Sequence, residues 1–207
     1  MLEAIELECE RGGRKLFRGL SLALGAGERL RIVGPNGSGK TSLLRILCGL
    51  LAPAAGEVRW QGRSIESLRE EYARHLVYLG HAPAIKDDLS AAENLAIACT
   101  LAGRSASSAE ISGALERFGL GGSAAPTRRL SQGQRKRAAL ARLPLSAQAP
   151  LWLLDEPYAA LDTAAARTVD SLVQAHAASG GAVVFTTHQE AGIPGAKVLE
   201  LEGSLRV

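Results

Sequence analysis

Residues 34 to 41 read Gly34-Pro35-Asn36-Gly37-Ser38-Gly39-Lys40-Thr41, and this stretch satisfies the pattern G-x-x-x-x-G-K-[ST] at every position. A short apolar strand pattern precedes it, and a helical pattern over Thr41–Leu50, with Leu50 on its apolar stripe, follows it. The glycines let the backbone turn successive N–H groups toward one anion, and the helix N-terminus adds a positive dipole end. We therefore predict a phosphate-binding loop.

In such a loop, Lys40 bridges the β- and γ-phosphates of ATP, and the Thr41 hydroxyl ligates Mg²⁺. Ser42, the next residue along the chain, belongs to the same predicted nucleotide-binding set. A glycine-rich turn with a chance Lys-Thr pair is the alternative interpretation. The strand before the loop and the helix after it favour the phosphate-binding interpretation.

A second apolar strand pattern, Leu151–Leu154, ends in two adjacent carboxylates, Asp155 and Glu156. In α/β sheets, ligands bind at the carboxyl ends of the strands. We expect Asp155 to hold Mg²⁺ through a water, beside Thr41. Glu156 is the expected general base for the water that attacks the γ-phosphorus. An exposed acidic turn would be the better interpretation of this string alone, and the phosphate loop changes that balance.

The composition fits one compact domain over residues 1–207, since 46% of the chain is hydrophobic and 22% is charged. A net charge of +3 gives no reason to expect nucleic acid as a partner. One basic cluster, which we interpret as a solvated helix face, comprises Arg128, Arg129, Arg135, Lys136 and Arg137. No window approaches the roughly 20 apolar residues that span a bilayer, so any membrane role requires other subunits.

The pattern along the chain predicts a strand–helix–strand core interrupted by a helical insertion. The core covers residues 1–81 and 147–207, and the helical part covers residues 82–146. The expected strands are Leu2–Glu8, Leu16–Leu24, Leu30–Val33, Glu57–Trp60, Leu76–Leu79, Leu151–Leu154 and Ala182–Thr186, with a final hairpin of Lys197–Leu201 and Ser204–Val207. The other expected helices are Ala91–Leu101, Ala109–Phe118, Gln132–Leu143 and Thr163–Ala178.

A third motif lies between the phosphate loop and the carboxylates, and it reads Leu130-Ser131-Gln132-Gly133-Gln134. Ser131 is a good N-cap, and Gly133 permits close backbone approach at the start of the helix. The order of the three motifs resembles the ABC ATPases, in which L-S-x-G-Q is the family signature. The resemblance implies a P-loop NTPase ABC cassette of the α/β class, with a RecA-like core, an N-terminal antiparallel β subdomain and a helical insertion subdomain.

The same resemblance implies a head-to-tail homodimer, in which Ser131 and Gly133 of one subunit contact the γ-phosphate held by Lys40 of the other. It assigns Asp162, after Pro157, to the loop that communicates across the dimer. It assigns His188 to the switch histidine that contacts the γ-phosphate and orients Glu156.

Two positions depart from the family pattern. His81 stands where most relatives carry a glutamine, and an imidazole does not replace an amide oxygen in a Mg²⁺ shell. Arg11 stands where an aromatic residue usually stacks on adenine, and a guanidinium plane can also stack on a base.

The string around His81, the chain length and the ending Thr186-Thr187-His188-Gln189-Glu190 resemble the ATP-binding subunits of cytochrome c biogenesis haem exporters. That resemblance implies integral membrane subunits docking near Ala82–Thr100, an indirect link to a haem chaperone, and a place at the cytoplasmic face of the bacterial inner membrane. The alternatives are another small ABC exporter, a soluble ABC ATPase of DNA repair or translation, and a module that holds nucleotide without turnover. A single cassette without heptads disfavours the soluble ATPase, and Glu156 with His188 disfavours the last alternative.

Overall fold

The computed structural model describes residues 1–122, 124–187, 193 and 195–202. Two sheets organise this part of the chain. The first is antiparallel, in the order β2-β1-β4-β5, and consists of β1 (Leu2–Arg11), β2 (Arg14–Leu24), β4 (Ala55–Trp60) and β5 (Arg63–Ser64). The second is parallel, in the order β6-β7-β8-β3-β9, and consists of β3 (Arg29–Val33), β6 (Leu76–Leu79), β7 (Leu151–Leu154), β8 (Ala182–Thr186) and β9 (Lys197–Glu200).

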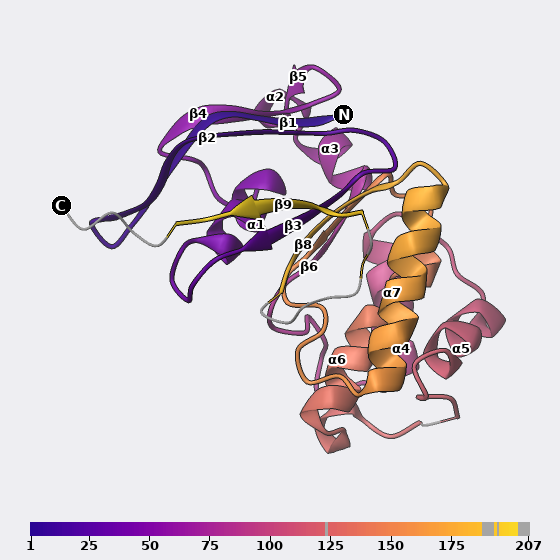
Figure 1. The fold of residues 1–207 in the computed structure, drawn as a ribbon. Helices are drawn as coiled ribbons and strands as arrows, with labels where there is room; N and C mark the ends of the chain where they lie inside the picture. Colours follow the sequence, from indigo (N-terminus) through magenta and orange to yellow (C-terminus); the bar gives the residue numbers. More distant parts are fainter. Residues whose placement is uncertain (123, 188–192, 194, 203–207) are drawn as a thin grey trace.

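The helices divide between the two faces of the parallel sheet. α1 (Lys40–Leu47) lies between the two sheets, while α4 to α7 gather at the other end of the molecule (Figure 1). These are α4 (Ala91–Leu101), α5 (Ser108–Glu116), α6 (Gln132–Leu140) and α7 (Thr163–Ala178). Short helices complete the set: α2 (Ile65–Leu68), α3 (Glu70–Arg74), η1 (Thr127–Arg129) and η2 (Pro144–Ser146).

The core has two apolar layers because successive side chains of a strand point to opposite faces. Leu151 and Leu153 of β7 pack in the layer shared with α1 and the antiparallel sheet. Trp152 and Leu154 of the same strand pack in the layer shared with the helices α4 to α7. All four residues of β7 are buried, as expected for a strand covered on both faces. The next residue, Asp155, therefore lies at the end of a rigid central strand.

The predicted α/β class, antiparallel β subdomain and helical insertion are confirmed. Five predicted elements match the observed bounds: β6, β7, β8, α4 and α7. The first helix ends at Leu47, and Leu50 is 68% exposed rather than part of its apolar stripe. Gly49, with φ of 76°, takes the chain out of the helix there. α6 ends at Leu140, three residues earlier than predicted, and Pro144 begins the separate helix η2.

The predicted final hairpin is wrong for its first strand, because β9 joins the parallel sheet beside β3. The second predicted strand, Ser204–Val207, lies outside the described residues. The segment between β4 and β6, for which the sequence predicted no element, forms β5, α2 and α3. Among the described residues, no helix combines the length and the apolar character that crossing a membrane requires.

Candidate nucleotide-binding site

The loop between β3 and α1 is shaped by glycines that no other residue could replace. Gly34 has a φ of 148°, and a Cβ at this position would lie 2.5 Å from the carbonyl oxygen of Leu201. Gly39 has a φ of 101°, and a Cβ there would lie 3.1 Å from both Leu16 and Phe17. Both positions combine a conformation that side chains rarely adopt with close neighbours. Leu201 on one side, and Leu16 and Phe17 of β2 on the other, therefore leave room only for glycine at these two positions of the loop.

Lys40 curls back over this loop. Its Nζ donates to the carbonyl oxygens of Gly34 at 2.8 Å and Pro35 at 3.0 Å, and the residue is 8% exposed. The ammonium group is thus held by the backbone of the loop that precedes it. An anion bound against the loop amides would meet this charge.

A cavity of about 740 Å³ opens over the loop, within the size range of small-molecule sites. It brings together side chains from residue 11 to residue 159. Its lining consists of Arg11, Leu16, Asn36, Gly37, Gly39, Lys40, Thr41, Ser42, Arg45, His81, Asp155, Glu156 and Ala159. Arg11 and His81, the two departures from the family pattern, therefore both border the same cavity as the phosphate loop. Gly34, Pro35 and Ser38 do not line it, and Ser38 is 1% exposed.

Asp155 is buried at the base of this cavity. Its backbone N–H donates to Leu79 of the neighbouring strand at 2.7 Å. Its Oδ2 accepts a hydrogen bond from Thr41 Oγ1 at 2.9 Å, and its Oδ1 accepts one from Thr186 Oγ1 at 2.8 Å. Asp155 is 1% exposed, and the two hydroxyl donors offset the cost of burying its carboxylate. Thr41 and Asp155 together offer the hard oxygen donors that Mg²⁺ prefers.

Glu156 leaves the strand in a left-handed conformation, with φ of 49°. This conformation is uncommon for a residue other than glycine and is typical of functional sites. The backbone N–H of Glu156 donates to Thr186 Oγ1 at 2.8 Å. Thr186 thus joins both carboxylate residues, accepting from one backbone and donating to the other side chain. Thr186 was not predicted as a site residue, and the one signal that could have found it is its place at the carboxyl end of a predicted strand.

Lys136 corrects the interpretation of the basic cluster as a solvated face. It is 6% exposed, and its Nζ donates to the backbone oxygen of Asp155 at 3.4 Å. Burial lowers the pKa of the Lys136 ammonium, while the carboxylates of Asp155 and Glu156 oppose that shift. A side chain of α6 therefore places positive charge behind the two carboxylates.

The signature residues lie outside the cavity of their own chain. Ser131 is the N-cap of α6: its Oγ accepts from the backbone of Gln134 at 3.2 Å, and Gln134 Oε1 accepts from the backbone of Ser131 at 2.8 Å. Ser131 and Gln132 are exposed, and Leu130 is half-buried. The helix N-terminus therefore faces solvent, with its orphan N–H groups only partly satisfied by the cap.

The loop after Pro157 packs against the signature helix. A Cβ on Gly133 would lie 2.7 Å from the carbonyl oxygen of Ala160, which itself has a φ of 61°. Asp162 caps α7 by accepting from the backbone of Ala165 at 2.8 Å, and its other oxygen lies 3.7 Å from Arg137 Nη1. His188, the predicted switch residue, lies outside the described residues.

Known proteins share this fold. The family model for ABC transporters matches residues 17–159. A dimeric ATP-binding cassette, solved in a post-hydrolysis state with ADP and phosphate, superposes with a TM-score of 0.84 at 24% identity and 100% coverage of both chains. The chain belongs to the ABC transporter family and is an ABC-type ATPase that binds ATP.

Two curated relatives narrow this class. The cytochrome c biogenesis ATP-binding export protein CcmA of Nitrosospira multiformis is 50% identical over 202 residues, which is 97% of this chain and 98% of the relative. The protein of the same name from Aromatoleum aromaticum is 54% identical over 192 residues, or 92% of this chain and 90% of the relative. Within the ABC transporters, this chain belongs to the family of cytochrome c biogenesis ATP-binding export proteins.

Proposed function

We propose that this chain is the ATP-hydrolysing subunit of a membrane complex in cytochrome c biogenesis, which exports haem or releases a haem-loaded chaperone. The observation that carries the proposal is the meeting of Lys40, Thr41, Asp155 and Glu156 around one cavity. The relatives named for cytochrome c biogenesis and export supply the pathway. We divide the single ATPase unit into a core of residues 1–81 and 147–207 and a helical subdomain of residues 82–146.

In this function the loop amides and Lys40 hold the β- and γ-phosphates, and the Arg11 guanidinium faces the base. Thr41, and Asp155 through a water, would hold Mg²⁺, which would neutralise phosphate charge when bound. The Glu156 carboxylate takes a proton from the attacking water while the oxygen of that water bonds to the γ-phosphorus. The bond between the γ-phosphorus and the bridging oxygen of ADP breaks, and ADP and phosphate leave. His188 is the switch residue that contacts the γ-phosphate and orients Glu156. His81 borders the cavity, where it either acts through a water or makes metal sensing weaker than a glutamine would.

A second copy of the chain completes the site in this proposal. Ser131 is exposed, and neither Ser131 nor Gly133 lines the cavity of its own chain, so in this proposal both contact a γ-phosphate bound to another copy. The dimer is head to tail, and Asp162 lies in the loop that communicates between the two subunits.

Integral membrane subunits supply the anchor at the cytoplasmic face of the bacterial inner membrane. They dock near Ala82–Thr100, a range in which α4 exposes Ile97 at 44%.

One variant tests the ATPase proposal. Glu156→Gln keeps the shape of the side chain but cannot take up the proton, so the variant should bind ATP, accumulate a closed dimer and lose turnover. Turnover at the wild-type rate would exclude Glu156 as the base.

The pathway is tested in cells that lack this chain. Wild type should restore covalent haem attachment to c-type cytochromes and co-purify with integral membrane proteins after detergent extraction. Lys40→Ala should co-purify equally and restore no haem attachment. Full restoration by Lys40→Ala, or no membrane protein with wild type, would contradict the proposal.

A further inference from the structure

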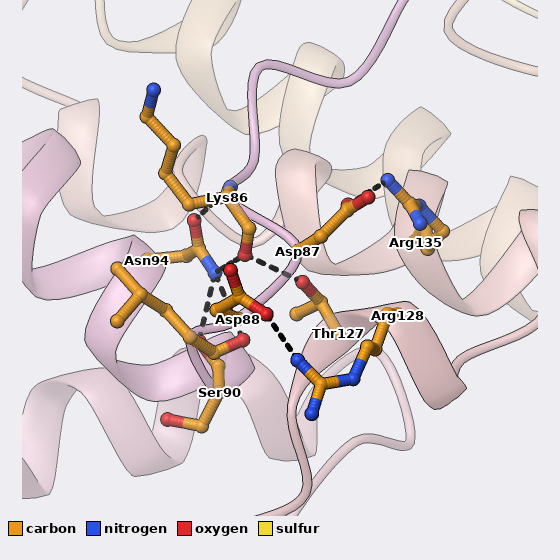
Figure 2. Close-up of polar contacts among 9 residues, drawn as sticks. Lys86, Asp87, Asp88, Ser90, Asn94, Thr127, Arg128 and Arg135 are labelled. Atoms are coloured by element: carbon orange, nitrogen blue, oxygen red, sulfur yellow. Dashed lines mark hydrogen bonds and ion pairs between the residues drawn. The ribbon is translucent and has the colours of Figure 1, made fainter.

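The segment Lys86–Ser90, which we call the strap, runs from the neighbourhood of His81 to the start of α4. Its backbone is fastened to α4 by the side chain of Asn94. Asn94 Oδ1 accepts from the Lys86 N–H at 2.6 Å, and Asn94 Nδ2 donates to the Lys86 carbonyl oxygen at 3.0 Å. Asn94 is 9% exposed, so its amide binds both the backbone N–H and the backbone carbonyl of Lys86 away from solvent (Figure 2).

The other side of the strap is fastened to η1, the turn that leads into the signature. Thr127 is fully buried, and its Oγ1 donates to the same Lys86 carbonyl oxygen at 2.8 Å. The Thr127 N–H donates to Leu89 at 2.8 Å, and the Arg128 N–H donates to Asp87 at 3.0 Å. The Lys86 carbonyl is thus a junction at which α4 and η1 meet.

Two ion pairs extend this junction past the signature on both sides. Asp88 pairs with Arg128, three residues before Ser131, and Asp87 pairs with Arg135, four residues after it. Figure 2 shows both pairs leaving the strap in different directions. Both ends of the segment that carries the signature are therefore tied to one short stretch of chain.

These pairs contribute little to the stability of the fold. Asp88 is 85% exposed and Asp87 is 57% exposed as side chains, and exposed ion pairs are typically worth about 0–1 kcal/mol. Their geometry has a different consequence. Lys136 already holds the inner side of α6 against Asp155, and the Asp87–Arg135 pair holds its outer side. These contacts hold the first half of α6 on two sides.

We propose that the strap sets the position of Ser131 relative to the nucleotide cavity, with Asp87 and Thr127 as positioning residues for ATP turnover. This inference rests on the proposed function, in which the signature reaches the γ-phosphate of the partner subunit. A misplacement of about 1 Å in such a contact can lower a rate by roughly 100-fold. The strap connects His81, which lines the cavity, to that contact through covalent chain and hydrogen bonds.

A charge-swap cycle in the full-length chain tests the ion pair. Asp87→Arg and Arg135→Asp each place like charges together, and we expect each to lower kcat by about tenfold, consistent with a sub-ångström displacement. The double variant restores an opposite pair and should return kcat to within about threefold of wild type. The Kd of each chain for a fluorescent ATP analogue should stay unchanged, since the strap does not line the cavity.

A matched control and a matched rescue separate positioning from folding. Arg63→Glu breaks an exposed pair with Glu71 in the antiparallel sheet region and should leave kcat unchanged. Thr127→Val removes the hydroxyl and should lower kcat, while Thr127→Ser keeps the hydroxyl and should retain at least half of it. Wild-type kcat in Asp87→Arg, or a double variant no better than either single variant, would overturn the proposal.

A dimer assay distinguishes failure of the strap from failure of the proposed function. With ATP, the Glu156→Gln variant should run as a dimer on size exclusion. Adding Asp87→Arg should raise the dissociation constant of that dimer by about tenfold. Absence of any ATP-dependent dimer in Glu156→Gln would overturn the action of the signature in a partner subunit. A Glu156→Gln dimer that Asp87→Arg leaves equally tight would overturn the strap alone.

Discussion

Gly133 of the signature lies directly against the backbone of Ala160, so that a Cβ on Gly133 would stand 2.7 Å from the Ala160 carbonyl oxygen. That distance is shorter than a carbon–oxygen contact tolerates, and the clash is with backbone. Ala160 is itself held at a φ of 61°, in the loop that follows Glu156. The absence of a side chain at Gly133 therefore lets the first turn of α6 pack against the loop that follows Glu156, in addition to any contact with a second copy.

Gly133→Ala should push α6 away from this loop. We expect turnover to fall at least tenfold and the free energy of unfolding to fall by about 1–3 kcal/mol, as for other overpacked sites. ATPase assays and denaturant melts measure the two effects. Gly113→Ala is the matched control, because a Cβ on Gly113 in α5 meets nothing within 4 Å. That control should gain about 1 kcal/mol of stability from helix propensity and keep full turnover.

Thr186→Val should remove the two hydrogen bonds by which Thr186 connects Asp155 and Glu156. The variant is nearly the same size but cannot donate to Asp155 or accept from the Glu156 N–H. A hydrogen bond to a charged group is worth about 1.5–3 kcal/mol, so kcat should fall by about tenfold or more while the Kd for ATP changes little. Thr186→Ser retains the hydroxyl and should recover most of the rate. Equal rates for the Val and Ser variants would show that the bridge is dispensable.

Lys136→Met tests the cation behind the two carboxylates. Methionine fills the space of the buried stem, but the Asp155 carboxylate then stays buried without its cationic neighbour, so the free energy of unfolding should fall, by up to about 3–5 kcal/mol. Turnover should fall, because positive charge behind Asp155 and Glu156 is lost. Arg74→Met, at an exposed position of α3, is the control that should affect neither quantity. A Lys136→Met enzyme with wild-type kcat would contradict a role for this cation.

His176 should make stability fall on mild acidification. Its ring stacks on Trp152 at 3.9 Å between centroids, and burial lowers its pKa to about 4. The unfolded chain takes up the proton near pH 6.5 and the folded chain only near pH 4. The stabilising contribution is therefore complete above pH 6.5 and is lost as the pH falls toward 4, by about 3 kcal/mol in full.

Thermal melts between pH 7.5 and pH 5 measure the larger part of this loss. His176→Gln does not titrate, so its Tm should change much less over the same range. An NMR titration of the wild-type ring should give the low pKa directly. A ring that titrates near pH 6.5 in the folded protein would contradict the assignment.

Contiguous features could be predicted from the sequence. The phosphate loop is a local arrangement of glycines between a strand and a helix, so it can be predicted from its own residues without knowledge of distant neighbours. The strands Leu151–Leu154 and Ala182–Thr186 and the helix Thr163–Ala178 follow from apolar periodicity, which is also local. The ABC class followed from the order of three such motifs along the chain.

Relationships between distant segments were decided only by the tertiary structure. β9 pairs with the edge of β3 that β8 does not cover. A short-range sequence pattern cannot reveal which strand edge is available for pairing. Lys136 carries a charge that favours solvent, and only the packing of α6 against Asp155 buries it. The sequence by itself determined the phosphate loop and the class of protein, because those depend on neighbouring residues. The burial of charge, the role of Thr186 and the strap depend on contacts made after the chain has folded.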